Sequence, residues 1–340
     1  MITTGNRGAR NAFSVGVLGT GSYVPAHVIS NEEVGAPAGV DHEWILGKTG
    51  IRERRWAKPD EATSDLAVIA GRAALESAGI RARQLSFIVV ATSTPDQPQP
   101  PTAAVVAAEL GADQGTAAFD VNGVCTGFLF ALTTAQGMLA AATGEGYALV
   151  IGADVYSRIL NREDRRTTIL FGDGAGAVVL GPAAGEGRGI LANRLASFAA
   201  DRHLIEVPGG GSRIPTTAET LAEGLQYFTM NGRGVRDFVA ANVPPAIHAF
   251  LSERGLTTAD IAHFVPHQAN GHMLKDLSEE IGVGTDRTWT TYERYGNTGA
   301  ASVPITLDRA ARSGRLADGD LVLLAGFGGG MALGLSLVRW

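Results

Sequence analysis

Short runs of apolar and β-branched residues alternate with helical patterns along the first half of the chain. We predict strands at 14–18, 87–91, 117–121, 148–151 and 177–180, and helices at 64–78, 103–110 and 128–143. This alternation is typical of an α/β fold. The helix at 128–143 is the most apolar, but it is too short, and too interrupted by Gln136 and threonines, to span a bilayer unaided. We therefore expect it to be a buried central helix.

The second half of the chain repeats the order of the first. FIVVATSTP (87–95) resembles HFVPHQAN (263–270), and GYALVIGAD (146–154) resembles GDLVLLAGF (319–327). Between these pairs, NGVCTGF (122–128) and YGNTGAA (295–301) are Gly-flanked turns that open apolar helices. The repeat predicts two copies of one β/α unit, with a seam near the Gly-rich stretch 181–189 and halves at 1–182 and 183–340. We expect the copies to pack face to face, with function at the shared centre.

Composition narrows the classes of function. The 340 residues include 28 Lys plus Arg and 34 Asp plus Glu, without a block of like charge, so we expect no nucleic-acid-binding surface. Nearly all the bases are arginines, and the 45 glycines suggest tight packing of small residues. The N-terminal segment is polar and does not resemble a secretory signal. We expect a cytoplasmic protein without a membrane partner.

Three motifs suggest chemistry that the neighbouring residues do not support. GVLGTGS (16–22) lacks the third glycine of a dinucleotide fingerprint, so we interpret it as a plain strand-to-loop turn. FGDGAGAVVL (171–180) lacks the Lys-Ser/Thr of a phosphate loop, and its glycines fit close backbone packing better. His263 and His267 have the spacing of zinc ligands on a helix, but Pro266 lies between them and no Glu accompanies them. We predict no metal site.

Cys125 is the only cysteine and lies between a predicted strand and the apolar helix that follows. It can form neither an internal disulfide nor a multi-cysteine metal site. A sulfur at a helix N-terminus favours the thiolate, because free N–H groups and the helix dipole stabilise negative charge. The alternative is an inert, buried cysteine. The position by itself leaves both interpretations open.

The second half of the chain favours the nucleophile. His267 follows an apolar strand within PHQAN, and Asn297 lies in the turn that the duplication matches to the Cys125 turn. A single histidine is more often a satisfied surface or core group. Three polar residues at turns related by the repeat are harder to explain by packing, and we expect Cys125, His267 and Asn297 to converge at the centre of the molecule.

These segments carry a family resemblance. Together with EWILGKTGIRERR (43–55), LFGDGAGAVVL (170–180) and GFGGG (326–330), they resemble β-ketoacyl-acyl carrier protein synthase III, in order over nearly the whole chain. The resemblance implies the thiolase fold, an internally duplicated α-β-α-β-α architecture, and a homodimer with a Cys-His-Asn active site. It implies no cofactor beyond coenzyme A thioester substrates. It also places the loop 94–102, which has four prolines, near the partner's acyl pocket.

The resemblance also implies roles for individual residues. Cys125 would take the acyl group from coenzyme A as a thioester, and His267 and Asn297 would stabilise the enolate formed when a malonyl thioester loses carbon dioxide. The N–H groups of Cys125 and Gly329 would form the oxyanion hole, and Phe327 would line the malonyl pocket. The coenzyme A site implied by the resemblance consists of Trp44 and Arg165 on either face of the adenine, Lys48 near the phosphates, and Arg233 and Asn270 along the pantetheine and phosphate arm.

The sequence departs from this family after PHQAN. Family members of fatty-acid synthesis commonly carry Arg and paired lysines on the next helix, whereas this chain has His272, Glu279 and Glu280. Lys48 also replaces a usual Arg. We expect an acceptor other than a generic acidic carrier protein: a dedicated carrier, a malonyl-coenzyme A thioester or a small molecule.

Three functions remain open at this point. The first is a decarboxylative condensing enzyme that primes fatty-acid or polyketide synthesis. The second is an acyltransferase of the same fold that passes an acyl or malonyl group to a hydroxyl or amine without releasing carbon dioxide. The third is a non-catalytic partner subunit, against which the retention of Cys125, His267 and Asn297 argues.

Overall fold

Two β-sheets organise the computed structural model, which describes residues 14–142 and 146–340. The first sheet has the order β1-β7-β6-β4-β5 and the second β11-β12-β13-β8. The first consists of β1 (Val15–Tyr23), β4 (Leu85–Ala91), β5 (Ala117–Val121), β6 (Tyr147–Asp154) and β7 (Gly174–Pro182). The second consists of β8 (Gly189–Ser197), β11 (His263–Pro266), β12 (Leu321–Gly328) and β13 (Ala332–Arg339). The predicted strands of the first half are all present. The N-terminal segment 1–13, and residue 143 at the end of the helix predicted at 128–143, lie outside the described residues.

The two sheets share one pairing pattern. Strand β6 is antiparallel to β7 and parallel to β4, and β12 is antiparallel to β13 and parallel to β11. Strands β1 and β8 pair antiparallel with β7 and β13 in the same way. The duplication predicted from the sequence is therefore confirmed by the topology. The first sheet ends at Pro182 and the second begins at Gly189, although the division at 182/183 stays a prediction.

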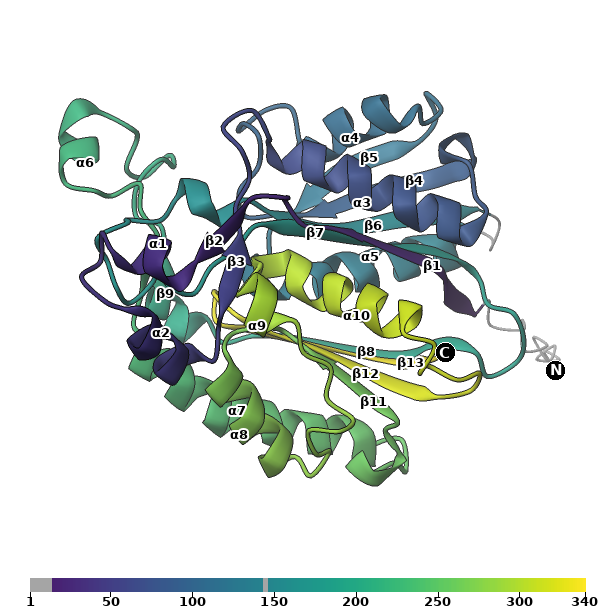
Figure 1. The fold of residues 1–340 in the computed structure, drawn as a ribbon. Helices are drawn as coiled ribbons and strands as arrows, with labels where there is room; N and C mark the ends of the chain where they lie inside the picture. The colour runs from purple at the N-terminus through teal and green to yellow at the C-terminus, as the bar shows by residue number, and fades with distance from the viewer. Residues whose placement is uncertain (1–13, 143–145) are drawn as a thin grey trace, which may run out of the picture.

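The helices form three layers around the sheets (Figure 1). Helices α3 (Thr63–Ala78) and α4 (Thr102–Leu110) cover the outer face of the first sheet, and α7 (Gly232–Ser252) and α8 (Gly271–Glu280) cover the outer face of the second. Helices α5 (Gly127–Ala141) and α10 (Ser302–Arg312) lie between the sheets. The layers follow the order α-β-α-β-α, as expected.

Helix α5 is buried because both sheets need an apolar partner. Its residues Phe128, Leu129 and Leu132 are fully buried in a core that includes side chains from both sheets. Within the described residues, 124–141 is the one stretch that is long and apolar enough to cross a membrane, and half of it is buried inside the protein. We interpret it as the central core helix that the sequence predicts.

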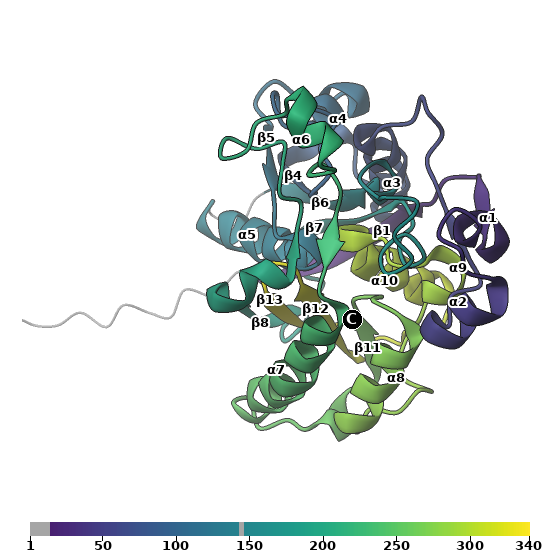
Figure 2. The same ribbon diagram turned by 90° about the vertical axis from the view of Figure 1, so that its left-hand side faces the viewer.

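Most of the smaller elements lie at the left-hand end of the sheets in Figure 1, which is the end that faces the viewer in Figure 2. They are β2 (Val28–Ser30), α1 (Asn31–Gly35), α2 (His42–Thr49), β3 (Glu53–Arg55), β9 (Ile205–Glu206), α6 (Ala218–Ala222), β10 (Thr229–Met230) and α9 (Tyr292–Tyr295). Short 3-10 segments lie at η1 (Ala82–Gln84), η2 (Val124–Thr126), η3 (Tyr156–Arg158), η4 (Ala199–Leu204), η5 (Thr258–Asp260) and η6 (Gly299–Ala301).

The segment 16–22 corrects one expectation. It is not a strand-to-loop turn, because β1 continues to Tyr23. Its glycines serve the packing of α3 instead: a Cβ on Gly19 would lie 2.5 Å from Ala78 N, and a Cβ on Gly21 would lie 2.3 Å from Ala74 N. The glycines of 171–180 act as predicted, since a Cβ on Gly176 would lie 2.5 Å from Ile305 N in α10.

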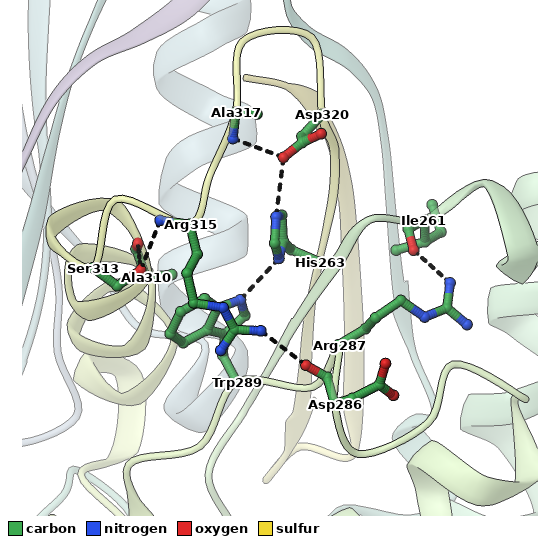
Figure 3. A network of polar contacts seen from close by, with 10 residues as sticks. All are labelled: Ile261, His263, Asp286, Arg287, Trp289, Ala310, Ser313, Arg315, Ala317 and Asp320. Atoms are coloured by element: carbon green, nitrogen blue, oxygen red, sulfur yellow. Dashed lines mark hydrogen bonds and ion pairs between the residues drawn. The ribbon is translucent and has the colours of Figure 1, made fainter.

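His263 has a structural role at the start of β11 (Figure 3). The indole N–H of Trp289 donates to His263 Nδ1 at 3.2 Å, so Nε2 carries the ring proton and donates to Asp320 at 3.0 Å. The neighbouring Arg315 side chain donates to the Asp286 carbonyl at 3.0 Å. Both ring nitrogens of His263 are therefore occupied within the core, and the described residues contain no cluster of three potential metal ligands.

Candidate active site

Cys125 lies in the 3-10 turn η2, which connects β5 to α5. The preceding residue, Val124, has φ +48°, a conformation that β-branched residues rarely adopt. Gly328 makes room for the nucleophile from the second sheet, since a Cβ there would lie 2.6 Å from Cys125 Cβ and 3.0 Å from Sγ. The strained turn and the glycine opposite it together hold the sulfur at the meeting point of the two sheets.

His267 follows the end of β11 and is buried. Its Nδ1 lies 2.7 Å from Ser302 Oγ, which also accepts the Gln268 N–H at 3.3 Å. The Ser302 proton has no other acceptor among the described contacts, so it is donated to Nδ1, and Nε2 carries the ring proton. Burial lowers the pKa of His267 to about 3, so the ring is neutral. It also lies edge-on against Phe327, with centroids 5.4 Å apart.

Asn297 lies in the turn before η6 and is also buried. Its backbone N–H donates to the Leu170 carbonyl at 2.8 Å, and its Oδ1 accepts the Gly299 N–H at 3.0 Å. The side-chain NH₂ keeps two donors for a ligand. Gly299 has φ +58°, and a Cβ there would lie 2.3 Å from Asp154 Oδ2, so this turn requires glycine.

These three side chains line one cavity of about 130 Å³. Phe327, Asn270 and Gly328 also line it, and its remaining walls are largely apolar: Leu170, Phe171, Ile205, Phe228, Met230, Gly232, Val235, Ala269 and Met273. The convergence expected from the duplication is present in the structure. A small, apolar cavity with a thiol and two neutral donors suits acyl chemistry that builds up negative charge on oxygen.

The thiolate expected from the helix N-terminus is not favoured in the unliganded protein. Burial, with the nearby Asp154 charge, raises the pKa of Cys125 to about 12. The backbone N–H groups of Gly329 and of Cys125 itself favour the thiolate and oppose this shift. Desolvation outweighs them because the thiol is almost fully removed from water. The same two N–H groups are those predicted for an oxyanion hole.

Of the five residues predicted to bind coenzyme A, Asn270 lines this cavity, and Trp44, Lys48, Arg165 and Arg233 do not. The Arg165 guanidinium lies over the Trp44 ring, 5.8 Å from its centroid, and Lys48 is exposed in the last turn of α2. Arg233 lines an open depression of about 800 Å³ that shares Met230 and Gly232 with the inner cavity. Asn270 caps α8 by accepting the Met273 N–H at 3.0 Å.

The sequence alone did not predict several residues that line this region or contact its side chains. Arg166 and His203 line the outer depression beside Arg233, and the Arg166 guanidinium adds positive charge to it. Tyr156 opposes the effect of burial on the Cys125 pKa by favouring the thiolate, and Ser302 fixes the tautomer of His267. A tyrosine at the end of a strand and a serine at the start of a helix carry no motif of their own, so only the fold could find them.

Comparison with known proteins places this site in context. Residues 119–198 match the model of the family 3-oxoacyl-[acyl-carrier-protein (ACP)] synthase III, and residues 251–340 match the model of its C-terminal part. The chain is 59% identical over 326 residues to acetoacetyl CoA synthase NphT7 of Streptomyces sp. strain CL190, covering 95% of this chain and 98% of that protein. It is 42% identical to the β-ketoacyl-[acyl-carrier-protein] synthase III of Symbiobacterium thermophilum, covering 96% and 98%.

Solved structures agree with this assignment. The 3-oxoacyl-(acyl carrier protein) synthase III of Pseudomonas aeruginosa superposes with a TM-score of 0.87 at 35% identity, covering 96% of this chain and 98% of that one. A priming β-ketosynthase from a polyketide biosynthetic pathway also gives 0.87, at 34% identity and 96% coverage of both chains. The protein therefore belongs to the 3-oxoacyl-[acyl-carrier-protein] synthase III family of thiolase-fold acyltransferases.

Proposed function

We propose that this enzyme takes a short acyl group from an acyl-coenzyme A onto Cys125 and condenses it with a malonyl thioester, releasing carbon dioxide. The observation that carries the proposal is the single cavity lined by Cys125, His267 and Asn297. In the first half-reaction the sulfur attacks the acyl carbonyl and coenzyme A leaves. The N–H groups of Cys125 and Gly329 are donors for the developing oxyanion.

The second half-reaction uses the donors on the other side of the cavity. His267 Nε2–H and the Asn297 NH₂ hydrogen-bond the malonyl thioester carbonyl and stabilise the enolate left by decarboxylation. Both groups are neutral donors before the charge develops, which suits an enolate. Phe327 gives the cavity an apolar wall that disfavours the carboxylate. The enolate carbon then attacks the acyl-Cys125 carbonyl, and the Cys125 thiolate leaves.

Cavity size and surface charge support a short primer and a coenzyme A-linked acceptor. About 130 Å³ accommodates only a small acyl group beside the malonyl unit. Helix α8 carries the exposed Lys275 against Asp276, Glu279 and Glu280, which does not attract an acidic carrier protein. One relative is named as an acetoacetyl CoA synthase, and that activity fits both features.

The proposal also includes the coenzyme A site, the homodimer and the location of the enzyme. Trp44, Lys48, Arg165, Arg233 and Asn270 would bind coenzyme A, with Arg166 adding positive charge and His203 a ring nitrogen for hydrogen bonding at the outer depression. The proline-rich loop is exposed at 95–101, which supports a homodimer in which it contacts a second copy. We place the enzyme in the cytoplasm, with a dedicated carrier protein as the alternative acceptor.

Mass spectrometry after exposure to a panel of acyl-coenzyme A thioesters tests the proposed nucleophile. We expect one acyl mass, from a short acyl group, on the peptide that contains Cys125, and none in Cys125→Ala. An acyl group carried elsewhere, or an unchanged turnover rate in Cys125→Ala, would show that Cys125 is not the nucleophile.

A matched pair of glycine variants sharpens this test. Gly328→Ala should lose the adduct, because its Cβ would meet the Cys125 side chain. Gly330→Ala also carries a positive φ, but its Cβ meets nothing closer than 3.7 Å, so it should still acylate. Equal acylation of the two variants would contradict the position assigned to the sulfur.

A further inference from the structure

His267 is held in place through both its backbone and its ring. Its backbone N–H donates to the Ala325 carbonyl in β12 at 2.7 Å. Its Nδ1 lies 2.7 Å from the hydroxyl of Ser302, the first residue of α10. His267 and Ser302 are both buried, so water does not compete for this contact. Of the two ring nitrogens, Nε2 is the one left for a ligand in the cavity.

The next residue, Gln268, anchors the loop that carries His267. Its buried side-chain NH₂ donates to the backbone carbonyls of Pro266 and Trp289, at 2.8 and 3.2 Å. Its Oε1 accepts two backbone N–H groups at the N-terminal end of α9, at 2.7 and 3.2 Å. The amide therefore has one orientation that satisfies both of its ends. This anchor fixes the loop against the α10 residue that contacts the ring.

The hydrogen bonds around Ser302 determine where the ring proton lies. Its oxygen accepts the Gln268 backbone N–H at 3.3 Å, and its own proton is directed to His267 Nδ1. With the ring proton on Nδ1 instead, two N–H groups would point at the same hydroxyl oxygen. The hydroxyl proton would then have no acceptor among the described contacts, so the arrangement favours the proton on Nε2.

The group that contacts Nδ1 is a neutral hydroxyl. A histidine that acts as a general base commonly has a carboxylate at this position, because the negative charge stabilises the imidazolium that forms. Within the described residues, no hydrogen bond or ion pair joins the His267 ring to an Asp or Glu. Burial also lowers the pKa of His267 to about 3. These surroundings suit a ring that donates a hydrogen bond and keeps its proton.

We propose that Ser302 is a positioning residue for the decarboxylation half-reaction, in which its hydroxyl holds His267 as an Nε2–H donor to the malonyl thioester carbonyl. This inference rests on the proposed function. As the bond to the malonyl carboxylate breaks, carbon dioxide leaves and the electron pair passes into the enolate. The enolate oxygen accepts the hydrogen bond from Nε2, and the ring proton stays on Nε2 throughout. Ser302 touches no reacting atom and acts through the ring.

Ser302→Ala removes the hydroxyl without adding bulk. With enzyme that is already acylated on Cys125, we expect kcat for carbon dioxide release from malonyl-coenzyme A to fall roughly tenfold, the effect of one lost hydrogen bond on a barrier. KM should change little, because the donor matters most when the enolate charge develops. Single-turnover acylation, followed by mass spectrometry, should stay near the wild-type rate because that step does not use the Nε2 donor.

Thr20→Val is the matched control for the loss of a buried hydroxyl. Thr20 is buried, and its hydroxyl donates to Asp308 in the same helix α10 at 2.7 Å. Valine keeps the shape of the side chain and removes this one bond. We expect a lower free energy of unfolding in urea, with both half-reactions near their wild-type rates.

Nuclear magnetic resonance of protein labelled with ¹⁵N-histidine reads the tautomer directly. The chain has seven histidines, and the His267 signals are those missing from His267→Gln. Two-bond correlations between ring protons and nitrogens should show Nε2 protonated and Nδ1 unprotonated in the wild-type protein. In Ser302→Ala, the nitrogen shifts should move toward a mixture of the two tautomers, which a purely structural role of Ser302 does not predict.

The outcomes separate this inference from the proposed function. A wild-type ring protonated on Nδ1 would overturn the inference even if Ser302→Ala failed to fold. Equal losses in the two half-reactions of Ser302→Ala, or the same loss of carbon dioxide release in Thr20→Val, would also overturn it. If wild-type enzyme forms no adduct on Cys125 with any thioester, the proposed function itself fails.

Discussion

The reactive side chains are held as neutral species until substrate arrives. Burial raises the pKa of Cys125 to about 12 and lowers that of His267 to about 3, so neither is charged near neutral pH. Both shifts have the same main cause, the removal of a charged form from water, and the Asp154 charge adds to the shift of Cys125. Negative charge therefore develops only during the reaction, at positions where N–H donors are already fixed.

The His267 shift makes a prediction about stability. Its pKa in the folded protein lies below the ordinary value of 6.5. Below about pH 6.5 the unfolded chain therefore binds a proton at His267 that the folded protein does not bind. The free energy of unfolding should fall as pH drops below about 6.5, at about 1.4 kcal/mol per pH unit. Between about pH 7 and pH 5, urea denaturation should show wild type losing about 2 kcal/mol more than His267→Gln. Parallel losses in the two proteins would contradict the neutral, buried imidazole.

The three site residues could be predicted because the repeat places them at matching turns. Cys125 and Asn297 occupy equivalent turns, and His267 follows a strand equivalent to β4. Tyr156 and Ser302 could not be predicted, because their roles depend on side chains more than 30 residues away in sequence. The protonation of Cys125 was predicted wrongly, since a helix N-terminus is visible in the sequence and the depth of burial is not.

The turns at the ends of helices and strands bring the reactive side chains together. The turn η2 before α5 and the turn before η6 both reach the centre, while α8 lies on the outer face with its charged side chains in solvent. The exposed charged residues of α8 therefore contribute little to the stability of the fold. The net negative charge of this helix can therefore determine which acceptor binds.

Reversing the charge of α8 should change the choice of acceptor. We expect Glu279→Lys combined with Glu280→Lys to raise kcat/KM for malonyl on a generic acidic carrier protein roughly tenfold at low salt, and less at high salt. Malonyl-coenzyme A should be used as before. A control with the same charge change, Glu76→Lys combined with Glu109→Lys on α3 and α4, should have little effect. Efficient use of the generic carrier by wild type would show that docking does not depend on α8.

At the scale of the whole molecule, the two sheets close on a central layer of helices through glycine contacts. Gly176 in β7 touches the backbone of α10 at Pro304 and Ile305, and Gly152 in β6 lies against Ala300 in the same way. The duplicated α/β architecture could be predicted from the alternation of elements and their repeat. The close approach of particular backbones could not, and the glycines of β1 were consequently interpreted as a turn.

Two glycine substitutions test this packing. A Cβ on Gly176 would lie 2.5 Å from Ile305 N, so Gly176→Ala should lower the free energy of unfolding by about 1–3 kcal/mol or more. Gly137 lies exposed within α5, and a Cβ there meets nothing within 4 Å, so Gly137→Ala should raise stability by about 0.5–1 kcal/mol. Chemical denaturation measures both. A neutral Gly176→Ala would show that α10 packs less closely than the structure indicates.

We propose that the cavity couples acylation of Cys125 to decarboxylative condensation. The most direct measurement follows carboxyl-labelled malonyl-coenzyme A with the acyl-coenzyme A that acylates Cys125, counting carbon dioxide against β-ketoacyl thioester. We predict one carbon dioxide for each β-ketoacyl thioester in the wild-type enzyme, and no β-ketoacyl thioester in Cys125→Ala. Transfer of malonyl or acyl groups to a hydroxyl or amine without release of carbon dioxide would contradict it and identify the enzyme as a simple acyltransferase.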